Sequence, residues 1–411
     1  MIRAWVVIGV AAVSLAACGG GGSTSGTVAA PAPGATPTPT PGPASTAIAG
    51  VSNLTAASLP RWKAARAAVI GGRARARIAA VGDSTTAGLG SAGSLFADSA
   101  ARSYPADMAS YLRSRGLNAR ATSFFADAGS SAELTLSDRR ILLNAGWGFA
   151  TATPTIGGHP IVNTTTTAPI AFRPFSAADR VDIYDIPRTD GATMVVEVSG
   201  TQVGTIAPPA GVPAGLRRTQ FAFARAIDPF VSLHATANGG AIGGFRLVGI
   251  DAYDSTERDV AVWRMGASGS TTGFWLSGGY PGNPLDALSA AAPELTIVYL
   301  GLNDMLQGVS TASYRANIRE ILRRANAVGD VIVVVPNRIH PRLVPLDVQL
   351  AYAQVLADAA AEIGAPLVNL PQILGEYDAA QAAGYYFDDA HLSGPGYERI
   401  AATLGEVLLA Y

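Results

Sequence analysis

The sequence predicts an α/β domain, with a parallel sheet covered by helices on both faces, that is interrupted by an antiparallel β-sandwich. In residues 61–144 and 259–411, short apolar runs alternate with helix-length amphipathic segments, which is typical of βα units and a parallel sheet. In residues 145–258, short runs of alternating polarity are separated by Gly, Pro, Asn and Asp clusters, and no helical period appears. That pattern is typical of an antiparallel sandwich.

The first 18 residues resemble a bacterial lipoprotein signal. Arg3 is followed by an apolar run at 4–17, which is too short to span a bilayer and has the length of a signal-peptide core. The run ends at Cys18, the only cysteine of the chain and the residue that such a signal would lipidate. We therefore expect a lipid-anchored protein of the cell envelope, with the outer membrane favoured because Gly19 rather than an acidic residue follows. An ordinary cleaved signal is the alternative.

Residues 19–50 consist almost entirely of Gly, Ser, Thr, Pro and Ala. Such a segment has almost nothing to bury, so we expect a disordered tether. Its r.m.s. reach would be on the order of 30 Å. The tether would let the folded part move near a membrane surface.

Within the α/β part, strands and helices are expected in alternation. Strands are predicted at 78–81, 260–263, 295–300, 331–335 and 366–370, and helices at 105–115, 311–328, 346–363 and about 395 to the end. The 311–328 helix is the clearest, because apolar residues recur on one face and Gly329 follows as its stop signal. In the interruption, strands are predicted at 181–184, 193–198, 220–224, 230–234 and 245–250.

Composition and missing motifs exclude several classes of function. The net charge is −1, so nothing suggests a nucleic-acid partner. Lys63 is the only lysine, which disfavours Schiff-base, serine–lysine and P-loop chemistry. The segment 88–93 matches GxGxxG but begins well after a strand end, so it is expected to be a flexible loop rather than a nucleotide site. No GxSxG or HExxH string occurs, and we expect neither cofactor nor metal.

Polar motifs follow three of the predicted strands, and a fourth lies near the C-terminus. They are Gly82-Asp83-Ser84, Gly266-Ala267-Ser268-Gly269-Ser270-Thr271-Thr272, Gly301-Leu302-Asn303-Asp304 and Asp388-Asp389-Ala390-His391. Ligands of open parallel sheets bind at the carboxyl ends of the strands, where these motifs lie. In this order, the four motifs resemble the sequence blocks of the SGNH (GDSL-type) hydrolases, over residues 76–411 apart from the interruption.

This resemblance implies a flavodoxin-like α/β/α sandwich with a five-stranded parallel sheet, and a serine ester hydrolase. Ser84 would be the nucleophile and His391 the general base, since a serine hydroxyl needs an adjacent base and imidazole titrates near neutral pH. Asp388, one helical turn before His391, would hold the second ring nitrogen. By resemblance, the oxyanion hole would consist of the N–H groups of Ser84 and Gly269 and the amide of Asn303.

Some assignments stay open within this motif set. Gly129, in Ala128-Gly129-Ser130-Ser131, also follows a strand-like run and rivals Gly269. Asp389 rivals Asp388, which is preferred on family spacing. Arg264 and Met265 stand where the family often has an asparagine, a departure that could alter the wall of the cleft.

Other aromatic and histidine side chains have both a functional and a structural interpretation. Trp147 and Trp275 could be sugar platforms, but a role in the core or at an interface is favoured. His159 and His234 fall in the β part and are expected to be structural. His340 follows a strand and could line the cleft.

The acyl group and its acceptor are less constrained than the catalytic residues. An envelope anchor, a tether and a β insert favour removal of a small acyl group, such as acetyl, from a carbohydrate. The alternatives are a lipase, thioesterase or O-acyltransferase using the same residues, or a non-catalytic glycan-binding lipoprotein. The expected partners are an acylated small molecule or polysaccharide and the membrane, through the lipid on Cys18, and the chain is expected to be a monomer.

Overall fold

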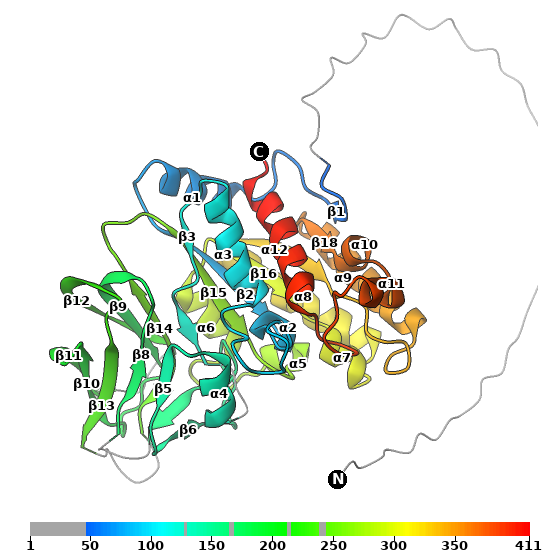
Figure 1. The fold of residues 1–411 in the computed structure, drawn as a ribbon. Coiled ribbons are helices and arrows are strands. Elements are labelled where there is room, and N and C mark those ends of the chain that lie inside the picture. The colour runs from blue at the N-terminus through cyan, green and yellow to red at the C-terminus, as the bar shows by residue number, and fades with distance from the viewer. Residues whose placement is uncertain (1–46, 127–129, 164–167, 212–214, 238–243) are drawn as a thin grey trace, which may run out of the picture. The chain divides into compact units, whose positions relative to one another are not determined.

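The computed structural model describes residues 47–126, 130–163, 168–211, 215–237 and 244–411 (Figure 1). The expected signal peptide, Cys18 and most of the expected tether lie outside these residues. Among the described residues, no helix is both long enough and apolar enough to cross a membrane.

A seven-stranded sheet forms the centre of the α/β part (Figure 1). In spatial order its strands are β1 (Val51–Ser52), β18 (Leu367–Asn369), β17 (Asp330–Val335), β16 (Leu295–Tyr299), β2 (Ala76–Gly82), β15 (Val260–Gly266) and β3 (Ala119–Arg120). All neighbours are parallel except β1, which pairs antiparallel with β18. The five strands from β15 to β18 have the order 2-1-3-4-5 of a flavodoxin-like sheet, so the predicted fold is confirmed. Two short edge strands, β1 and β3, extend the expected five.

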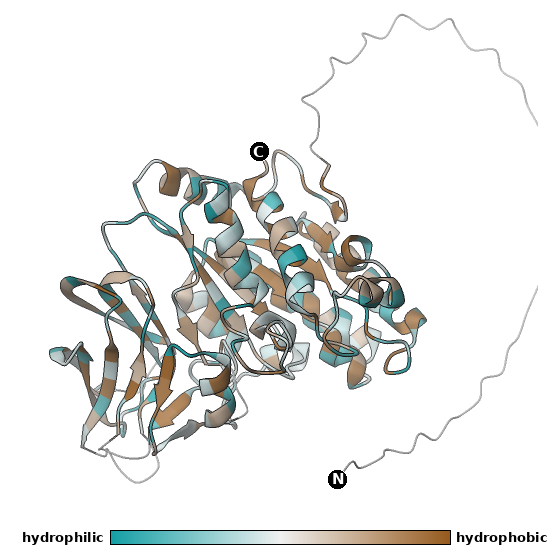
Figure 2. Cartoon of the chain, viewed as in Figure 1, coloured by the Kyte–Doolittle hydropathy of each residue, from teal (hydrophilic) through white to brown (hydrophobic). Residues whose placement is uncertain are grey.

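Helices cover both faces of this sheet. One face carries α1 (Pro60–Ile70), α3 (Tyr104–Ser114) and α12 (Gly394–Leu409), and the other carries α6 (Pro284–Ala291), α8 (Thr311–Val328) and α9 (Leu346–Glu362). The predicted face of α8 is buried through Ile318, Ile321, Leu322 and Ala325. The central strands are apolar along their length (Figure 2) and buried on both faces. Each large aliphatic side chain buried there contributes about 1.5–3 kcal/mol.

Short helices connect strand ends to the rest of the fold. They are α2 (Ser84–Ala87), α4 (Ser131–Ser137), α5 (Thr272–Trp275), α7 (Leu302–Leu306), α10 (Leu370–Leu374) and α11 (Tyr377–Ala382). Three of them, α2, α5 and α7, follow the neighbouring strands β2, β15 and β16 directly or after a short loop. Three of the four sequence motifs therefore lie together at the carboxyl ends of neighbouring strands.

The interruption forms two antiparallel sheets. The first contains β12 (Arg217–Ile227), β9 (Ala177–Asp185), β14 (Arg246–Tyr253), β7 (Ile161–Asn163) and β6 (Trp147–Phe149), with β4 (Phe124–Phe125) paired to β14. The second contains β11 (Thr201–Ile206), β10 (Thr193–Val198), β13 (Val231–Ala237), β8 (Ile170–Phe172) and β5 (Ile141–Leu143). Apolar residues of both sheets share one core, as in a β-sandwich. The sandwich begins before the expected residue 145, because β4 and β5 already belong to its sheets. We refer to it below as the insert.

Aromatic rings and buried ion pairs join the insert to the central sheet. The ring centroids of Phe125 and Tyr184 lie 5.5 and 5.9 Å from that of Trp263 on β15. Nearby, the Arg75 guanidinium contacts the buried carboxylates of Asp251 and Asp259, at 3.4 and 2.7 Å. Because these charges are buried, losing one partner would leave the other uncompensated. The junction is therefore packed like a core.

Candidate active site

Ser84 lies at a sharp strand-to-helix turn at the carboxyl end of β2. Gly82 ends the strand and has no room for a side chain, since a Cβ there would lie 2.0 Å from Thr86 Oγ1. Asp83 is the N-cap of α2, and its Oδ1 accepts a hydrogen bond from the Thr85 N–H at 2.9 Å. Ser84 is the first helical residue, so its N–H has no acceptor within the helix. The turn thus presents both the hydroxyl and the N–H of Ser84 at the carboxyl end of the central sheet.

A chain of hydrogen bonds links Ser84, His391 and Asp388. Ser84 Oγ lies 3.0 Å from His391 Nε2, and His391 Nδ1 lies 2.8 Å from Asp388 Oδ2. With Nδ1 donating to the carboxylate, Nε2 is left to accept the serine proton. The structure therefore brings together the three residues that the sequence predicts as catalytic, and the arrangement is that of a serine–histidine–aspartate triad.

Asp388, rather than Asp389, faces the histidine. Burial raises the pKa of the Asp388 carboxyl, but hydrogen bonds from the His391 ring and from the backbone N–H groups of His391 and Ala390 outweigh it and lower the pKa to about 2. Asp389 instead forms an ion pair with Arg342 and accepts a hydrogen bond from the Tyr377 hydroxyl at 3.2 Å. The preference for Asp388 thus agrees with the geometry.

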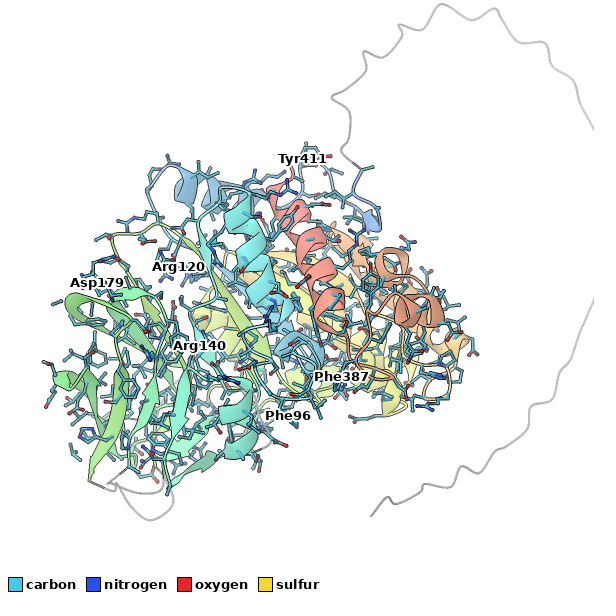
Figure 3. The ribbon with its side chains drawn as sticks, viewed as in Figure 1. Phe96, Arg120, Arg140, Asp179, Phe387 and Tyr411 are labelled. Atoms are coloured by element: carbon cyan, nitrogen blue, oxygen red, sulfur yellow. The ribbon has the colours of Figure 1, made fainter. Side chains whose placement is uncertain are left out.

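The loop that carries His391 is fixed by a buried asparagine after β17. Asn337 accepts a hydrogen bond from the Tyr299 hydroxyl at 2.5 Å, and its amide donates to the Ala390 carbonyl at 3.0 Å. On its other side, the loop packs its Phe387 side chain against Gly90, where a Cβ would lie 2.9 Å from Phe387 Cβ. Gly90 is therefore required for close packing rather than for the flexibility expected of segment 88–93. Figure 3 labels Phe387 and Phe96, which both lie toward the lower side of the view.

The loop after β15 lies directly beside the Ser84 turn. The Ala267 N–H donates to the Gly82 carbonyl at 2.9 Å, and the Ser270 N–H closes a turn by donating to the Ala267 carbonyl at 3.0 Å. Gly269 occupies the third position of this turn with φ +74°, as a type II turn requires. Among the described residues, no acceptor is found for the Gly269 N–H. That donor lies in the loop that is bonded to Gly82, two residues before Ser84.

Asn303 and Asp304, after β16, hold this loop from the other side. Asn303 Nδ2 donates to the Ser270 carbonyl at 3.1 Å, and the amide carries a second hydrogen. The buried Asp304 carboxylate accepts hydrogen bonds from the Thr272 N–H at 3.0 Å and the Thr272 hydroxyl at 2.5 Å. Burial raises the pKa of Asp304, although the bonds from Thr272 oppose this. The expected oxyanion donors of Gly269 and Asn303 are therefore tied to one rigid unit.

The rival glycine, Gly129, lies outside the described residues. Its neighbour Ser130 caps α4 by accepting a hydrogen bond from the Glu133 N–H at 3.2 Å. Which of Gly129 and Gly269 donates its N–H to the oxyanion hole stays a prediction. The hydrogen bond between the Gly269 loop and Gly82 favours Gly269.

Arg264, which departs from the family pattern, is a buried structural cation. Its guanidinium donates to the Ala87 carbonyl at 3.2 Å and lies 3.5 Å from the Asp138 carboxylate. It therefore connects the end of α2 with the segment that enters the insert.

The other candidate side chains occupy structural positions. Trp275 is fully buried and donates from Nε1 to Ser270 Oγ at 3.2 Å, and the buried Trp147 donates to the Ala168 carbonyl at 2.7 Å, so neither ring is a sugar platform. His159 packs edge-on against Phe274 at 5.6 Å, and burial lowers its pKa. His340 Nδ1 accepts the Arg342 N–H at 3.0 Å.

Two supporting residues are not predicted as functional positions by the sequence. Asn337 is visible there only as a polar residue after a strand, and Asp304 only as a motif member without an assigned role. Their partners, Tyr299, Ala390 and Thr272, are distant in the sequence, so no local signal identifies these bonds.

Comparisons with known proteins agree with this geometry. Residues 249–399 match the model of the GDSL-like lipase/acylhydrolase family, a span that holds Gly269, Asn303, Asp388 and His391, whereas Ser84 precedes the insert. A peptidoglycan O-acetylesterase structure matches 87% of this chain and 97% of its own at 15% identity, with a TM-score of 0.64.

Smaller matches include a lipase/acylhydrolase from Enterococcus faecalis (19% identity, 36% of this chain and 75% of that one, TM-score 0.31). An acetylxylan esterase from Geobacillus stearothermophilus has 17% identity and covers 38% of this chain and 76% of its own, with a TM-score of 0.31. No curated protein sequence matches the chain.

Proposed function

Since the chain belongs to the SGNH (GDSL-type) hydrolase superfamily and is an esterase of that type, we propose that it works through an acyl-Ser84 intermediate and removes small acyl groups, above all acetyl, from a carbohydrate. The observation that carries the proposal is the hydrogen-bonded series from Ser84 Oγ to His391 to Asp388, at 3.0 and 2.8 Å. It lies where β2 and β16 meet, at the point of the sheet where the strand order reverses.

In the first step, Ser84 Oγ attacks the ester carbonyl carbon while His391 Nε2 accepts the hydroxyl proton. The resulting tetrahedral intermediate collapses, the bond to the sugar oxygen breaks, and His391 returns the proton to that oxygen. A water molecule then attacks the acyl-Ser84 carbonyl while His391 accepts its proton. The bond between the acyl carbon and Ser84 Oγ breaks, His391 returns the proton to Oγ, and the acid leaves. Asp388, with its pKa lowered to about 2, stays ionised and stabilises the imidazolium formed in each step.

The negative charge of the intermediate would be stabilised by three donors: the N–H of Ser84, the N–H of Gly269 and the side-chain amide of Asn303. Each is held in place before the substrate arrives, the glycine by its turn and the asparagine by its bond to the Ser270 carbonyl at 3.1 Å. Preorganised donors need no rearrangement during the reaction, and each is worth about 3–4 kcal/mol of transition-state stabilisation.

The carbohydrate part of the proposal is supported by the insert. The matched peptidoglycan O-acetylesterase covers 87% of this chain, a share too large for the α/β part alone, so the similarity of fold includes a sandwich beside the catalytic sheet. A β-sandwich beside the catalytic sheet gives a polymer more surface than a small ester needs. An acetyl group on such a polymer is our proposed substrate.

We further propose that the enzyme is anchored to the cell envelope by lipid on Cys18 and reaches its polymer on the tether at 19–50. Support comes from the sequence alone, in the apolar run that ends at the only cysteine. In a Gram-negative host, the chain should fractionate with membranes, and Cys18→Ala should release it. Equal membrane association of both forms would contradict lipidation at this residue.

Hydrolysis of p-nitrophenyl acetate, butyrate and octanoate by the purified protein and by Ser84→Ala tests the catalytic proposal. We expect activity that falls with acyl-chain length and is abolished in the variant. Equal rates in the two proteins would refute the acyl-Ser84 mechanism, and a preference for octanoate would refute the small-acyl specificity.

A further inference from the structure

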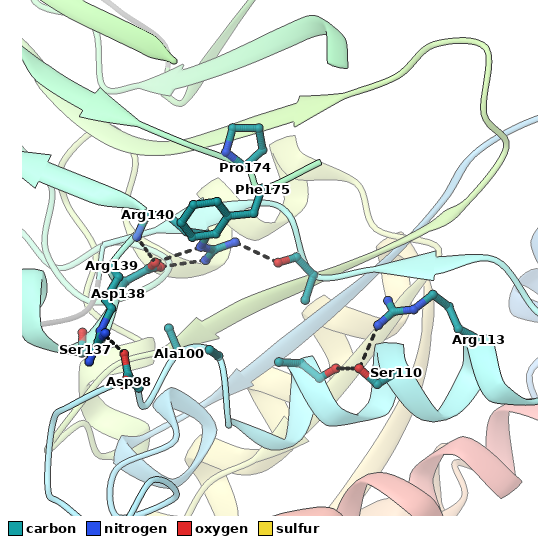
Figure 4. Close-up of a pocket in the computed structure, with 13 residues that line it drawn as sticks. Asp98, Ala100, Ser110, Arg113, Ser137, Asp138, Arg139, Arg140, Pro174 and Phe175 are labelled. Carbon is teal, nitrogen blue, oxygen red and sulfur yellow. Dashed lines mark hydrogen bonds and ion pairs between the residues drawn. The ribbon is translucent and has the colours of Figure 1, made fainter. Parts of the chain in front are cut away.

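A cavity lies between the catalytic sheet and the insert, and none of the residues that line it belongs to the four sequence motifs. Its volume is about 320 Å³ (Figure 4). One wall is formed by residues 98–101, in the loop that follows α2, together with α3. The opposite wall is formed by residues 137–140 and by the Pro174-Phe175 pair after β8. Cavities between packed layers are common ligand sites, so the lining chemistry is informative.

The walls of this cavity are held together by backbone and charge contacts. The Asp98 N–H donates to the Leu136 carbonyl at 2.9 Å, and the Ala100 N–H donates to the Ser137 carbonyl at 3.0 Å. Across the same gap, the Arg139 guanidinium forms an ion pair with the Asp98 carboxylate. The loop that follows α2 is thus fixed to the segment that enters the insert, and the cavity is a preformed one.

A buried ion pair forms the base of the cavity. Arg140 contacts both oxygens of Asp138, at 2.8 and 2.7 Å, and donates to the Ala121 carbonyl at 2.8 Å. Burial alone would raise the pKa of Asp138, but Arg140 and Arg264 outweigh it and lower the pKa. The charges of Arg140 and Asp138 therefore cancel each other and add no net charge to the cavity.

The same base connects the cavity to the catalytic helix. Arg264 contacts Asp138 on one side, at 3.5 Å, and donates to the Ala87 carbonyl on the other, at 3.2 Å. Ala87 ends the one-turn helix that begins at Ser84, and a helix rises 1.5 Å per residue. The whole of α2 therefore spans only about 5 Å, so the two contacts of Arg264 place the base of the cavity close to the Ser84 turn.

The mouth of the cavity offers an aromatic ring and an excess of positive charge. Phe175 is 58% exposed and has φ +53°, an unusual conformation for a bulky residue, and the Arg173 guanidinium lies 5.2 Å from the centre of its ring. Arg113 on α3 is exposed and donates to the Ala119 carbonyl at 2.6 Å, and the Arg139 side chain is 72% exposed. Among the described residues that line the cavity, Asp98 supplies the one carboxylate outside the buried base. An aromatic face suits the C–H side of a sugar ring, and guanidinium groups suit a carboxylate.

We propose that this cavity is an accessory subsite that binds a carboxylate-bearing sugar of the acylated glycan, a few units away from the sugar whose ester lies at Ser84. The inference rests on the proposed function as a glycan esterase and adds a substrate class to it, an acidic polysaccharide. Phe175 would stack on the sugar, and Arg139 would bind its carboxylate in competition with Asp98. Binding of one sugar at this subsite would hold the glycan so that an acyl group on a nearby sugar of the same strand reaches Ser84.

Binding in the full-length Ser84→Ala protein tests the subsite without catalysis. The probe is a soluble O-acetylated peptidoglycan strand freed of peptides, so that its lactyl carboxylates are exposed, beside the same strand with those carboxylates amidated. We expect amidation, Phe175→Ala and Arg139→Gln each to weaken calorimetric binding roughly tenfold, because a charge-assisted contact and an aromatic ring contact are each worth about that factor. Equal binding of the two strands, or unchanged binding in both variants, would overturn the inference.

Matched controls separate the subsite from general damage to the insert. Phe230→Ala removes an exposed ring (41% exposed) on the insert outside the cavity, and Arg323→Gln removes an exposed arginine on α8. Both should bind the strand as the parent does, and a loss equal to that of the cavity variants would count against the subsite. With Ser84 restored, the cavity variants should hydrolyse p-nitrophenyl acetate normally but show a raised KM on the strand. If the parent protein itself hydrolysed neither p-nitrophenyl acetate nor the strand, the proposed function would be refuted. The binding measurements would then still decide whether the cavity binds the strand.

Discussion

Replacement of Asp388 by asparagine should reduce kcat strongly, whereas the same change at Asp389 should not. In the parent, Asp388 Oδ2 accepts the His391 Nδ1–H at 2.8 Å, and Oδ1 accepts two backbone N–H groups at 2.6 and 2.8 Å. An asparagine amide that donates to Nδ1 would place the imidazole proton on Nε2. That nitrogen could then no longer accept the proton of Ser84.

The expected loss of kcat has two parts. The pKa of Asp388 is lowered from 3.8 to about 2, which corresponds to roughly 2–3 kcal/mol in favour of the ionised form. Because the side chain is 40% exposed, solvent screening reduces this to about 1–2 kcal/mol. The same substitution in the triad of a serine protease lowers kcat about 10⁴-fold, a loss that already contains both the lost charge and the tautomer change. We expect a fall of about 10²- to 10⁴-fold here, the lower end reflecting the exposure of Asp388.

The assay is the initial rate of p-nitrophenyl acetate hydrolysis by Asp388→Asn and Asp389→Asn at pH 8, with thermal melting of both proteins as a check on folding. Asp389→Asn is the matched control, because its carboxylate bonds Arg342 and Tyr377 rather than the imidazole. It should retain activity within a few-fold. A larger loss at Asp389 than at Asp388, in two equally folded proteins, would refute the assignment of the third catalytic residue.

Three further predictions concern the oxyanion hole, a buried carboxyl and the cation behind α2. Asn303→Ala should lower kcat about 10²- to 10³-fold in ester hydrolysis with little change in KM, because the lost donor acts on the transition state. A rise in KM alone would indicate a substrate-binding role instead. Burial, followed by repulsion from Glu398, raises the pKa of Asp107 to about 7. Between about pH 4 and 7 the folded chain therefore binds a proton at Asp107 that the unfolded chain has lost, so this carboxyl lowers the stability of the fold as pH rises through that window. Asp107→Asn should therefore raise Tm at pH 8 more than at pH 5 in melting scans, and the opposite ranking would contradict the argument. Arg264→Met should lower the free energy of unfolding by about 3–5 kcal/mol in urea titrations, because the substitution leaves the Asp138 carboxylate with one buried cation fewer. A loss below about 1 kcal/mol would show that Arg140 alone compensates the Asp138 charge.

The sequence was sufficient for elements in which many residues repeat one pattern. The helix at 311–328 was predicted with the bounds it has, because four apolar residues recur at helical spacing before a stop signal. The buried strands at the sheet centre were also predicted, since runs of apolar residues between loops have few other interpretations. Placing the motifs at strand ends then brought Ser84 and the Gly269 and Asn303 motifs to the same sheet edge.

Short strands and long-range contacts were not predictable in the same way. The two-residue strands β3 and β4 carry no alternation to detect, and β5 has only three residues. Because β4 and β5 belong to the insert, the insert begins earlier than expected. Its start depends on the pairing of β4 with β14 and of β5 with β8, which are distant in the sequence, rather than on local preference. The burial of Trp275 depends in the same way on tertiary packing, because an indole ring suits a core as well as a binding surface.

Covalent labelling with a p-nitrophenyl alkylphosphonate tests the central claim, that Ser84 is a nucleophile activated by His391, most directly. A phosphonate mimics the tetrahedral intermediate and stays on the attacking oxygen, so digestion and mass spectrometry identify the residue. We predict one equivalent of p-nitrophenol released, the adduct on Ser84, slow labelling in His391→Ala and none in Ser84→Ala. An adduct on another residue, or equal labelling of the parent and Ser84→Ala, would contradict the account.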